Sequence, residues 1–251
     1  MNSAGQPQAP RASPYSAAGG VSRCDASGGR AEDRLAEPDA QGCVLAGGQS
    51  SRMGRDKAFV EFLGRPLIAH ALGILQQAGL QAAIAGATPS ACSAFAAFAP
   101  VIPDALPGLG PLSGICAALD AATVRHTVFS PVDLPLLPPS LLVVLLRHAQ
   151  ITGSAVVAPT LSGFTQTFPA VIDRAALPVL QRELDRRRCG CYSAFRTAAH
   201  ELGQTIHNVA VESLVQAGQI CHPLSLPPLH WFLNLNTPAD LARAEAIQSR
   251  R

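Results

Sequence analysis

Short apolar runs alternate with helical stretches along most of this chain, and this alternation restricts the folds that it can adopt. The runs that predict strands lie at residues 43–46, 82–85, 101–102, 126–131, 155–159 and 231–235. The stretches that predict helices lie at residues 66–77, 89–99, 112–122 and 139–148, with one more after Thr237. This pattern is typical of a mostly parallel sheet with helices on both faces. We therefore expect an α/β fold with one Rossmann-like, doubly wound sheet, in which residues 164–211 form a less regular region.

The length and composition are those of one domain preceded by a different kind of segment. A chain of 251 residues, 48% of them hydrophobic, can bury a sizeable core. Residues 1–38 are rich in Gly, Ala, Ser and Pro and contain no apolar stretch long enough for a signal peptide or a membrane span. We expect a disordered extension over residues 1–38 and a single domain over residues 39–251. With no targeting signal evident, the cytoplasm is the expected location and a membrane is not an expected partner.

The charge and the cysteines argue against two classes of protein. A formal net charge of +2 differs from the concentrated basic face of a nucleic-acid-binding protein, so nucleic acid is not an expected partner. The seven cysteines are odd in number and scattered, and Cys43 and Cys116 lie in apolar surroundings. They are typical of reduced thiols in a cytosolic protein rather than of a disulfide framework.

The first apolar run continues into a glycine-rich, cationic segment, LAGGQSSRMGRDK, at residues 45–57. Glycine allows backbone N–H groups to approach an anion closely, and Arg52, Arg55 and Lys57 supply the countercharge. A strand that opens into such a loop favours phosphate binding. The alternative is an ordinary turn between a strand and a helix, with exposed basic residues.

Two common phosphate-binding motifs do not fit this loop. The P-loop needs Gly-Lys-Ser/Thr at its end, whereas Gly54 is followed by arginine and Lys57 by alanine. The dinucleotide fingerprint G-x-G-x-x-G fails because Gly47 and Gly48 are adjacent. The loop therefore belongs to neither class.

Two aspartates follow apolar runs further along the chain. Asp104 comes after Val101-Ile102-Pro103, and Asp133 comes after Phe129-Ser130-Pro131-Val132. Open parallel sheets bind ligands at the carboxyl ends of their strands, so both carboxylates are candidate site residues. Either one could instead be a helix cap or a turn residue. Asp133 is the better placed, and a hard oxygen ligand beside a triphosphate suits Mg²⁺.

The segment at residues 45–57 resembles the signature L-A-G-G-x-S-x-R-M-G-x-D-K of the molybdenum cofactor guanylyltransferases. Three more motifs of that family follow in the expected order: Asp104 with G-P-L-S-G at residues 110–114, V-D-L-P at residues 132–135, and N-L-N-T-P at residues 234–238. Q-T-F-P at residues 166–169 occupies the place of a segment that contacts the pterin. One departure is that I-A-G-A-T at residues 84–88 has no asparagine, where the family often has one.

This resemblance implies a fold like that of the nucleotide-diphospho-sugar transferases, and transfer of GMP from GTP to the phosphate of molybdopterin with release of pyrophosphate. It implies that Asp133 holds Mg²⁺. It also implies that transient contacts with proteins of cofactor biosynthesis or with molybdoenzymes are possible. The implied GTP-binding residues are Leu45, Ala46, Gly47, Gly48, Lys57, Asp104 and Asp133. The implied catalytic residues are Arg52, Lys57 and Asp133, and the implied acceptor-side residues are Gln166, Pro169, Asn234 and Asn236.

Three alternatives stay open. One is a cytidylyltransferase for the same pterin, in which alanine usually replaces Gly47. The second is a sugar-phosphate nucleotidyltransferase, whose usual extra C-terminal domain has no counterpart here. The third is a nucleotide-binding module of the same fold that has lost its chemistry.

Three other features allow a functional and a structural interpretation. The arginines at residues 186–188 could bind the acceptor phosphate or form a solvated helix face. Cys189-Gly190-Cys191 lacks the two further nearby ligands of a zinc site, and Trp231 is expected in the core rather than as a base-stacking platform.

Overall fold

The computed structural model describes residues 40–46, 56–87, 91–104 and 106–249. The expected disordered extension, and residues 47–55 of the cationic loop, lie outside the described residues. No helix in the described ranges combines the length and apolar character needed to cross a membrane.

The centre of the molecule is an eight-stranded sheet in the order β10-β7-β9-β6-β1-β4-β5, with β8 added beside β7. Its strands are β1 (Ala40–Leu45), β4 (Ala82–Ala87), β5 (Val101–Pro103), β6 (His126–Pro131), β7 (Val156–Leu161), β8 (Phe164–Thr165), β9 (Ala170–Asp173) and β10 (His207–Ala210). All neighbouring pairs are parallel except those that include β8 or β9. A separate antiparallel hairpin joins β2 (Glu61–Phe62) to β3 (Arg65–Pro66).

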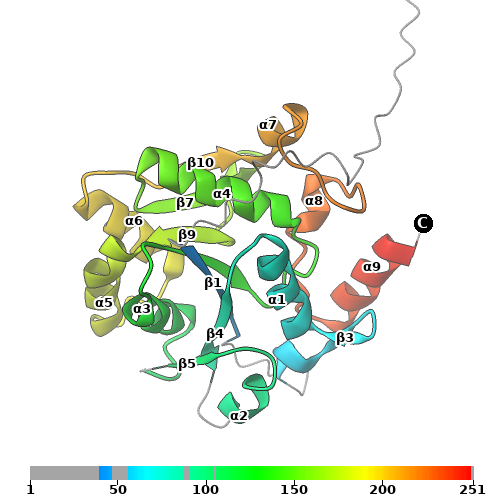
Figure 1. Cartoon of the computed structure of the whole chain (residues 1–251), viewed down its shortest axis with the longest axis horizontal. Coiled ribbons are helices and arrows are strands. Elements are labelled where there is room, and N and C mark those ends of the chain that lie inside the picture. Colours follow the sequence, from blue (N-terminus) through cyan, green and yellow to red (C-terminus); the bar gives the residue numbers. More distant parts are fainter. Residues whose placement is uncertain (1–39, 47–55, 88–90, 105, 250–251) are drawn as a thin grey trace, which may run out of the picture.

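Helices cover both faces of this sheet, as the alternating sequence predicted (Figure 1). They are α1 (Leu67–Gln77), α2 (Cys92–Phe95), α3 (Pro111–Ala121), α4 (Pro139–Thr152), α5 (Leu177–Asp185), α6 (Cys191–Glu201), α7 (Val211–Gln216), α8 (Pro228–Trp231) and α9 (Pro238–Ser249), with 3-10 turns η1 (Lys57–Phe59) and η2 (Arg174–Ala176). Helices α5 and α6 lie at one side of the molecule and α9 at the other (Figure 1). The expected α/β fold with a mostly parallel, doubly wound sheet is confirmed.

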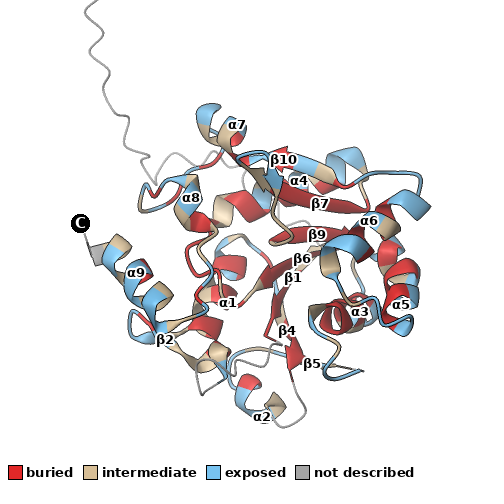
Figure 2. Cartoon of the chain, turned by 180° about the vertical axis from the view of Figure 1, so that it is seen from behind, coloured by how far each residue is buried: buried red, intermediate tan, exposed pale blue. Residues whose placement is uncertain are grey.

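The two faces of the sheet bury two separate hydrophobic clusters, because successive side chains of a strand point in opposite directions. In β1, Val44 packs with α1 and α4 on one face, whereas Cys43 and Leu45 pack with α3, α5 and α6 on the other. Figure 2 shows that the strands of the sheet are largely buried, whereas the helices around it carry many exposed residues. The strands therefore form a rigid support for the loops at their ends.

The orientation of β9 decides which loops meet at the functional edge. Strand β9 runs antiparallel to β6, so that Ala170 pairs with Phe129 and Asp173 with His126. The segment that precedes β9 therefore reaches the same edge as the segment that follows β6. This edge is also where β1 ends, since Leu45 pairs with Pro131.

Three expectations about local structure were wrong. Residues 164–211 are regular and contain β8, β9, α5, α6 and β10. Strand β9 was missed because it has only four residues, too few to show a clear strand pattern in the sequence. The run at residues 231–235 is not a strand. Instead, α8 ends at Trp231, whose indole N–H donates to the carbonyl of Leu226 at 2.7 Å, and Trp231 is buried in the core as expected.

The helix expected at residues 89–99 is also wrong in extent. Residues 88–90 lie outside the described residues, and the helix that follows is the single turn α2 (Cys92–Phe95). This alanine-rich stretch buries one large side chain, Phe95, whereas Phe98 is 38% exposed. Helix propensity without a continuous apolar face does not stabilise a longer helix.

Candidate active site

Three side chains from distant parts of the sequence meet at the edge where β1 and β6 end. The Lys57 ammonium lies 2.7 Å from Oδ2 of Asp133 and also donates to Oδ1 of Asn236 at 2.5 Å. The residues that Lys57 contacts are 76 and 179 positions further along the chain. We call Lys57, Asp133 and Asn236 the lysine cluster.

Asp133 is positioned by the turn that follows β6. The backbone N–H of Val132 donates to the carbonyl of Leu45 at 3.2 Å, which ties this turn to the end of β1. Val132 and Leu134 on either side are buried, whereas 20% of the Asp133 side chain is exposed. The carboxylate is thereby fixed at the carboxyl ends of two neighbouring strands, the usual ligand position in an open α/β sheet.

Lys57 is positioned by the short turn η1. The Asp56 carboxylate caps this turn by accepting from the N–H of Ala58 at 3.1 Å, and Ala58 is fully buried. The Phe59 ring stacks on that of Phe95 with a centroid distance of 4.9 Å. Asp56 of the Asp-Lys pair therefore has a structural role, and the backbone of Lys57 is anchored on both sides.

Asn236 is held between the Asp133 turn and the start of α9. The N–H of the buried Leu235 donates to the carbonyl of Asp133 at 3.0 Å. The Asp240 carboxylate accepts from the N–H groups of Asn236 at 3.1 Å and Thr237 at 2.8 Å, and the N–H of Asp240 donates back to the Thr237 hydroxyl at 3.2 Å. The hydrogen bond from the Thr237 hydroxyl is the main cause of the lowered pKa of Asp240. The helix cap at Thr237 is confirmed, and it also orients Asn236.

The lysine cluster is a partly enclosed cation site lined by oxygens. The Lys57 side chain is 15% exposed, so that its ammonium is largely removed from water and depends on Asp133 and Asn236 for hydrogen bonds. The attraction in a pair of this kind is less screened than on the open surface, and losing one partner leaves the other charge poorly satisfied. The arrangement can neutralise a phosphate with an ammonium and present a carboxylate to a cation.

Asp104 lies at a second point on the same edge, beyond β5. Its Oδ1 accepts hydrogen bonds from the Ser113 hydroxyl and from the N–H of Leu106, the latter at 3.3 Å. Ser113 is in the first turn of α3, so these contacts connect the loop after β5 to the start of that helix. The structure therefore joins Asp104 to α3, whereas the contacts of Lys57 are to Asp133 and Asn236.

Two glycines fix the approach of α3 to the sheet, and sequence reasoning did not find this contact. A Cβ on Gly114 would lie 2.8 Å from the backbone nitrogen of Gly86. Gly86 has φ of 77° and lies where the pairing of β4 with β5 is shifted, in the stretch that lacks the family asparagine. The available signal was that G-P-L-S-G ends in a glycine within a predicted helix, where glycine is unfavourable unless a close approach requires it.

The remaining residues expected to bind GTP are buried or lie outside the described residues. Leu45 and Ala46 are buried, and the N–H of Ala46 already donates to the carbonyl of Ala85 at 2.9 Å. Gly47, Gly48 and Arg52 lie outside the described residues.

The expected acceptor-side residues separate into two groups. Asn236 belongs to the lysine cluster, and the nearby Asn234 is exposed. Gln166 lies before β9. Its backbone N–H donates to the carbonyl of Pro159 at 2.8 Å, and its side-chain amide nitrogen donates to the carbonyl of Phe164 at 3.2 Å. Pro169 follows a cis peptide bond and is buried beside the start of β9. Both groups lie at the edge where β6 ends.

The other candidate features have structural partners. Arg186 and Arg188 contact the buried Glu183 at 3.3 Å and 3.7 Å, just after the end of α5. Burial raises the pKa of Cys191 and of Cys116 to about 12, so these thiols are poor nucleophiles at neutral pH. Within the described ranges, no group of three or more His, Cys, Asp and Glu side chains is arranged to hold a metal ion.

The open sheet, the strand-end carboxylate and the anchored lysine define the class of α/β proteins that handle phosphates at the carboxyl edge of a parallel sheet. Comparison with known proteins gives the family: residues 42–202 match the model of the MobA-like NTP transferase domain. The chain belongs to this family, and the resemblance predicted from its motifs is confirmed. The match ends before Asn236, so the third member of the lysine cluster lies beyond it.

Individual relatives agree with this assignment. A molybdenum cofactor guanylyltransferase of Rhizobium johnstonii is 32% identical over 86% of this chain and 96% of the relative. A second, from Xanthomonas euvesicatoria, is 44% identical over 43% of this chain and 54% of the relative. The structure of molybdopterin-guanine dinucleotide biosynthesis protein A from Archaeoglobus fulgidus shares the fold, with a TM-score of 0.69, 24% identity, and coverage of 84% of this chain and 100% of that one.

Proposed function

We propose that this protein transfers GMP from GTP to the phosphate of molybdopterin and thereby forms the guanine dinucleotide of the molybdenum cofactor. The observation that carries the proposal is the lysine cluster, in which Lys57, Asp133 and Asn236 come from three family motifs and meet at the ligand edge of the sheet. The names of the relatives support a guanylyl group as the group transferred and the molybdenum cofactor as its acceptor. In this reaction a phosphate oxygen of the pterin attacks the α-phosphorus of GTP, the bond to the β-phosphate breaks, and pyrophosphate leaves.

The acceptor phosphate is ionised at neutral pH, so the chain does not have to supply a strong base. Its task is to bring two polyanions together in line and to stabilise the charge at the α-phosphorus. Lys57 is suited to neutralise the phosphates, because its ammonium is anchored and 15% exposed. Arg52 is proposed to assist it, Asp104 to contact the nucleotide, and the segment before β9 to hold the pterin.

The residues present fit Mg²⁺. Asp133 offers a hard carboxylate oxygen at the ligand edge, and the amide oxygen of Asn236 lies against the same ammonium. Mg²⁺ is usually held by one or two carboxylates together with substrate phosphates, so one carboxylate is sufficient here. Asp133 would hold the ion, which when bound would neutralise phosphate charge.

The test is turnover of the purified protein with molybdopterin, Mg²⁺ and either GTP or CTP, followed by pyrophosphate release and by mass spectrometry of the dinucleotide. We expect product with GTP and none when molybdopterin is omitted. Product with CTP alone would assign the protein to the cytidylyl branch of the same pterin chemistry. Binding of GTP without turnover would favour the non-catalytic module.

Transient contacts with cofactor-biosynthesis proteins and molybdoenzymes, and location in the cytoplasm, stay predictions. Co-purification with a molybdoenzyme from the native host would test the former.

A further inference from the structure

The carboxylate expected to receive a divalent ion already has a cation beside it. The ammonium of Lys57 lies 2.7 Å from Oδ2 of Asp133, and both side chains are largely shielded from water, with 15% and 20% exposed. At this distance and degree of burial, the attraction is much less screened than on the open surface.

The same ammonium is held from a second direction. It donates to Oδ1 of Asn236 at 2.5 Å, and the backbone around Asn236 is fixed by the Asp133 carbonyl and the Asp240 carboxylate. To leave Asp133, Lys57 therefore has to give up one charge-assisted hydrogen bond, while Asn236 can continue to orient the ammonium. Its own backbone cannot follow easily, because Ala58 is fully buried and Phe59 is stacked on Phe95.

A divalent ion and this ammonium cannot share Asp133 at low cost. An ion such as Mg²⁺ lies about 2.1 Å from its oxygen ligands, which would place two positive charges close together in a partly shielded site. The repulsion is relieved only if a new anionic group takes the ammonium. A triphosphate at the carboxyl edge is such a group.

We propose that Lys57 is a resident cation that keeps divalent metal away from Asp133 until a nucleoside triphosphate draws the ammonium onto its phosphates. The inference rests on the proposed function for the roles of GTP and Asp133. It makes metal and nucleotide bind cooperatively, and by linkage GTP tightens metal binding by the same factor as metal tightens GTP binding. Lys57 thus has a second role besides phosphate neutralisation: it sets the conditions under which the metal site opens.

The test measures Mn²⁺ binding to the full chain by electron paramagnetic resonance. Without nucleotide it uses the loss of the free aquo-Mn²⁺ signal, and with GTP it uses the loss beyond that of a protein-free sample at the same GTP concentration. The wild type should bind Mn²⁺ weakly alone and at least about tenfold more tightly with GTP. Lys57→Met, which keeps the length of the side chain and removes its charge, should bind Mn²⁺ without nucleotide at least about tenfold more tightly than the wild type. GTP should then tighten Mn²⁺ binding by a smaller factor than in the wild type, because GTP still supplies phosphate ligands but no longer has to draw an ammonium away.

Three variants test whether the effect depends on the charge at position 57, on its location and on Asp133. Lys57→Arg keeps the positive charge and should bind Mn²⁺ alone as weakly as the wild type. Arg147→Met removes one charge from the exposed face of α4 and should leave Mn²⁺ affinity unchanged. Lys57→Met combined with Asp133→Asn should lose the gain in affinity. Thermal melts establish that each variant is folded before binding is compared.

Equal Mn²⁺ affinity of the wild type and Lys57→Met without nucleotide would overturn the inference, even in an enzyme that transfers GMP. Weak binding by wild type, tight binding by Lys57→Met and no GMP transfer would support the inference and overturn the proposed function. The two failures are therefore distinguishable.

Discussion

In the half of the sheet formed by β5, β4, β1 and β6 all neighbouring strands are parallel, whereas in the other half β9 runs antiparallel between β6 and β7. In the parallel half, the loops that follow the strands reach the functional edge, and they include the Asp133 turn. In the other half, it is the segment before β9 that reaches this edge, with Gln166 and Pro169. Reversing one strand thus brings a second set of side chains to the same edge, and we expect nucleotide chemistry on the first half and acceptor binding on the second.

The largest expected effect comes from removing the charges of the lysine cluster. Lys57→Ala and Asp133→Ala should each lower kcat/KM for GMP transfer by roughly 100-fold or more, because both residues are proposed to act on charge at the reacting phosphates. The double variant should lose less than the product of the two single losses, since the residues are in contact. Steady-state pyrophosphate release measures all three.

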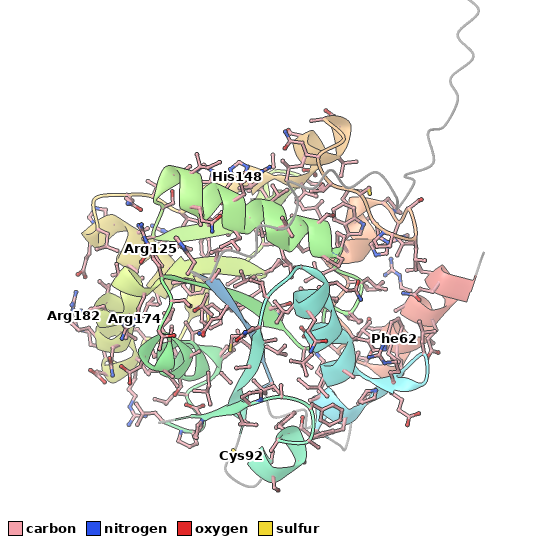
Figure 3. All side chains as sticks on the ribbon, in the orientation of Figure 1. Phe62, Cys92, Arg125, His148, Arg174 and Arg182 are labelled. Carbon is pink, nitrogen blue, oxygen red and sulfur yellow. The ribbon has the colours of Figure 1, made fainter. Side chains whose placement is uncertain are left out.

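The matched control is an ion pair away from this edge. Arg182 pairs with Glu201 through exposed side chains, and Figure 3 shows Arg182 at the opposite side of the molecule from Phe62, which follows η1. Arg182→Ala should leave kcat/KM within about twofold, because exposed ion pairs contribute little. Near-normal activity of either cluster variant would contradict its assigned role.

The next effect separates the two halves directly. Asn236→Ala removes an acceptor from the Lys57 ammonium and should lower kcat about tenfold, the usual range for a hydrogen bond to a charged group. Gln166→Ala should raise KM for molybdopterin and leave KM for GTP unchanged. If Gln166→Ala raised KM for GTP instead, the division of substrates between the halves would be wrong.

A stability effect tests the parallel half. Gly114→Ala would place a methyl group 2.8 Å from the backbone of Gly86, which cannot move aside as a flexible side chain could. We expect a loss of about 1–3 kcal/mol in the free energy of unfolding, measured by urea titration. Gly73→Ala in α1 meets nothing within 4 Å and should raise stability by up to about 1 kcal/mol. Equal effects of the two substitutions would show that α3 does not depend on this close approach.

The smallest effect belongs to the other half, at His148 on α4 (Figure 3). A ring nitrogen of His148 lies 3.0 Å from one of His207 on β10. Burial and then the neighbouring His207 lower the pKa of His148 below its usual value of 6.5. The unfolded chain therefore takes up a proton first, and the free energy of unfolding falls as the pH decreases below about 6.5. This contribution is fully present at higher pH, and we expect it to stay below about 1 kcal/mol because His148 is only partly buried.

Urea titrations between pH 5 and 8 measure this dependence. His207→Phe removes one cause of the lowered pKa and should flatten the slope of stability against pH. A slope that is unchanged in His207→Phe would contradict the assignment, whereas GMP transfer at neutral pH should be unaffected.

The fold of the parallel half could be predicted because its strands are continuous apolar runs between helices. Residues 126–131 form β6 as expected, and α1 and α3 begin within one residue of their predicted starts. The fold of the other half could not be predicted from such runs, because β9 has only four residues. Its antiparallel direction depends on pairing with strands that are distant in the sequence. Local pattern does not encode strand direction.

The candidate site could be predicted in part for the same reason. Motifs identified Lys57, Asp133 and Asn236 one by one, but the hydrogen bond from Lys57 to Asn236 joins positions 179 residues apart, so that its expected role was on the acceptor side alone. The contact of Gly114 with Gly86 involves backbone atoms and has no pattern of side chains to reveal it. Contacts formed by packing between elements have to come from the structure.

The hydrogen bond from Leu235 to Asp133 has a consequence for the order in which activity is acquired during translation. Lys57 and Asp133 leave the ribosome long before Asn236, and a domain generally folds as a unit. A nascent chain that extends through α6 holds the whole of β1 and β6 but lacks the segment that fixes the ammonium. Catalytic competence should therefore arise late in synthesis.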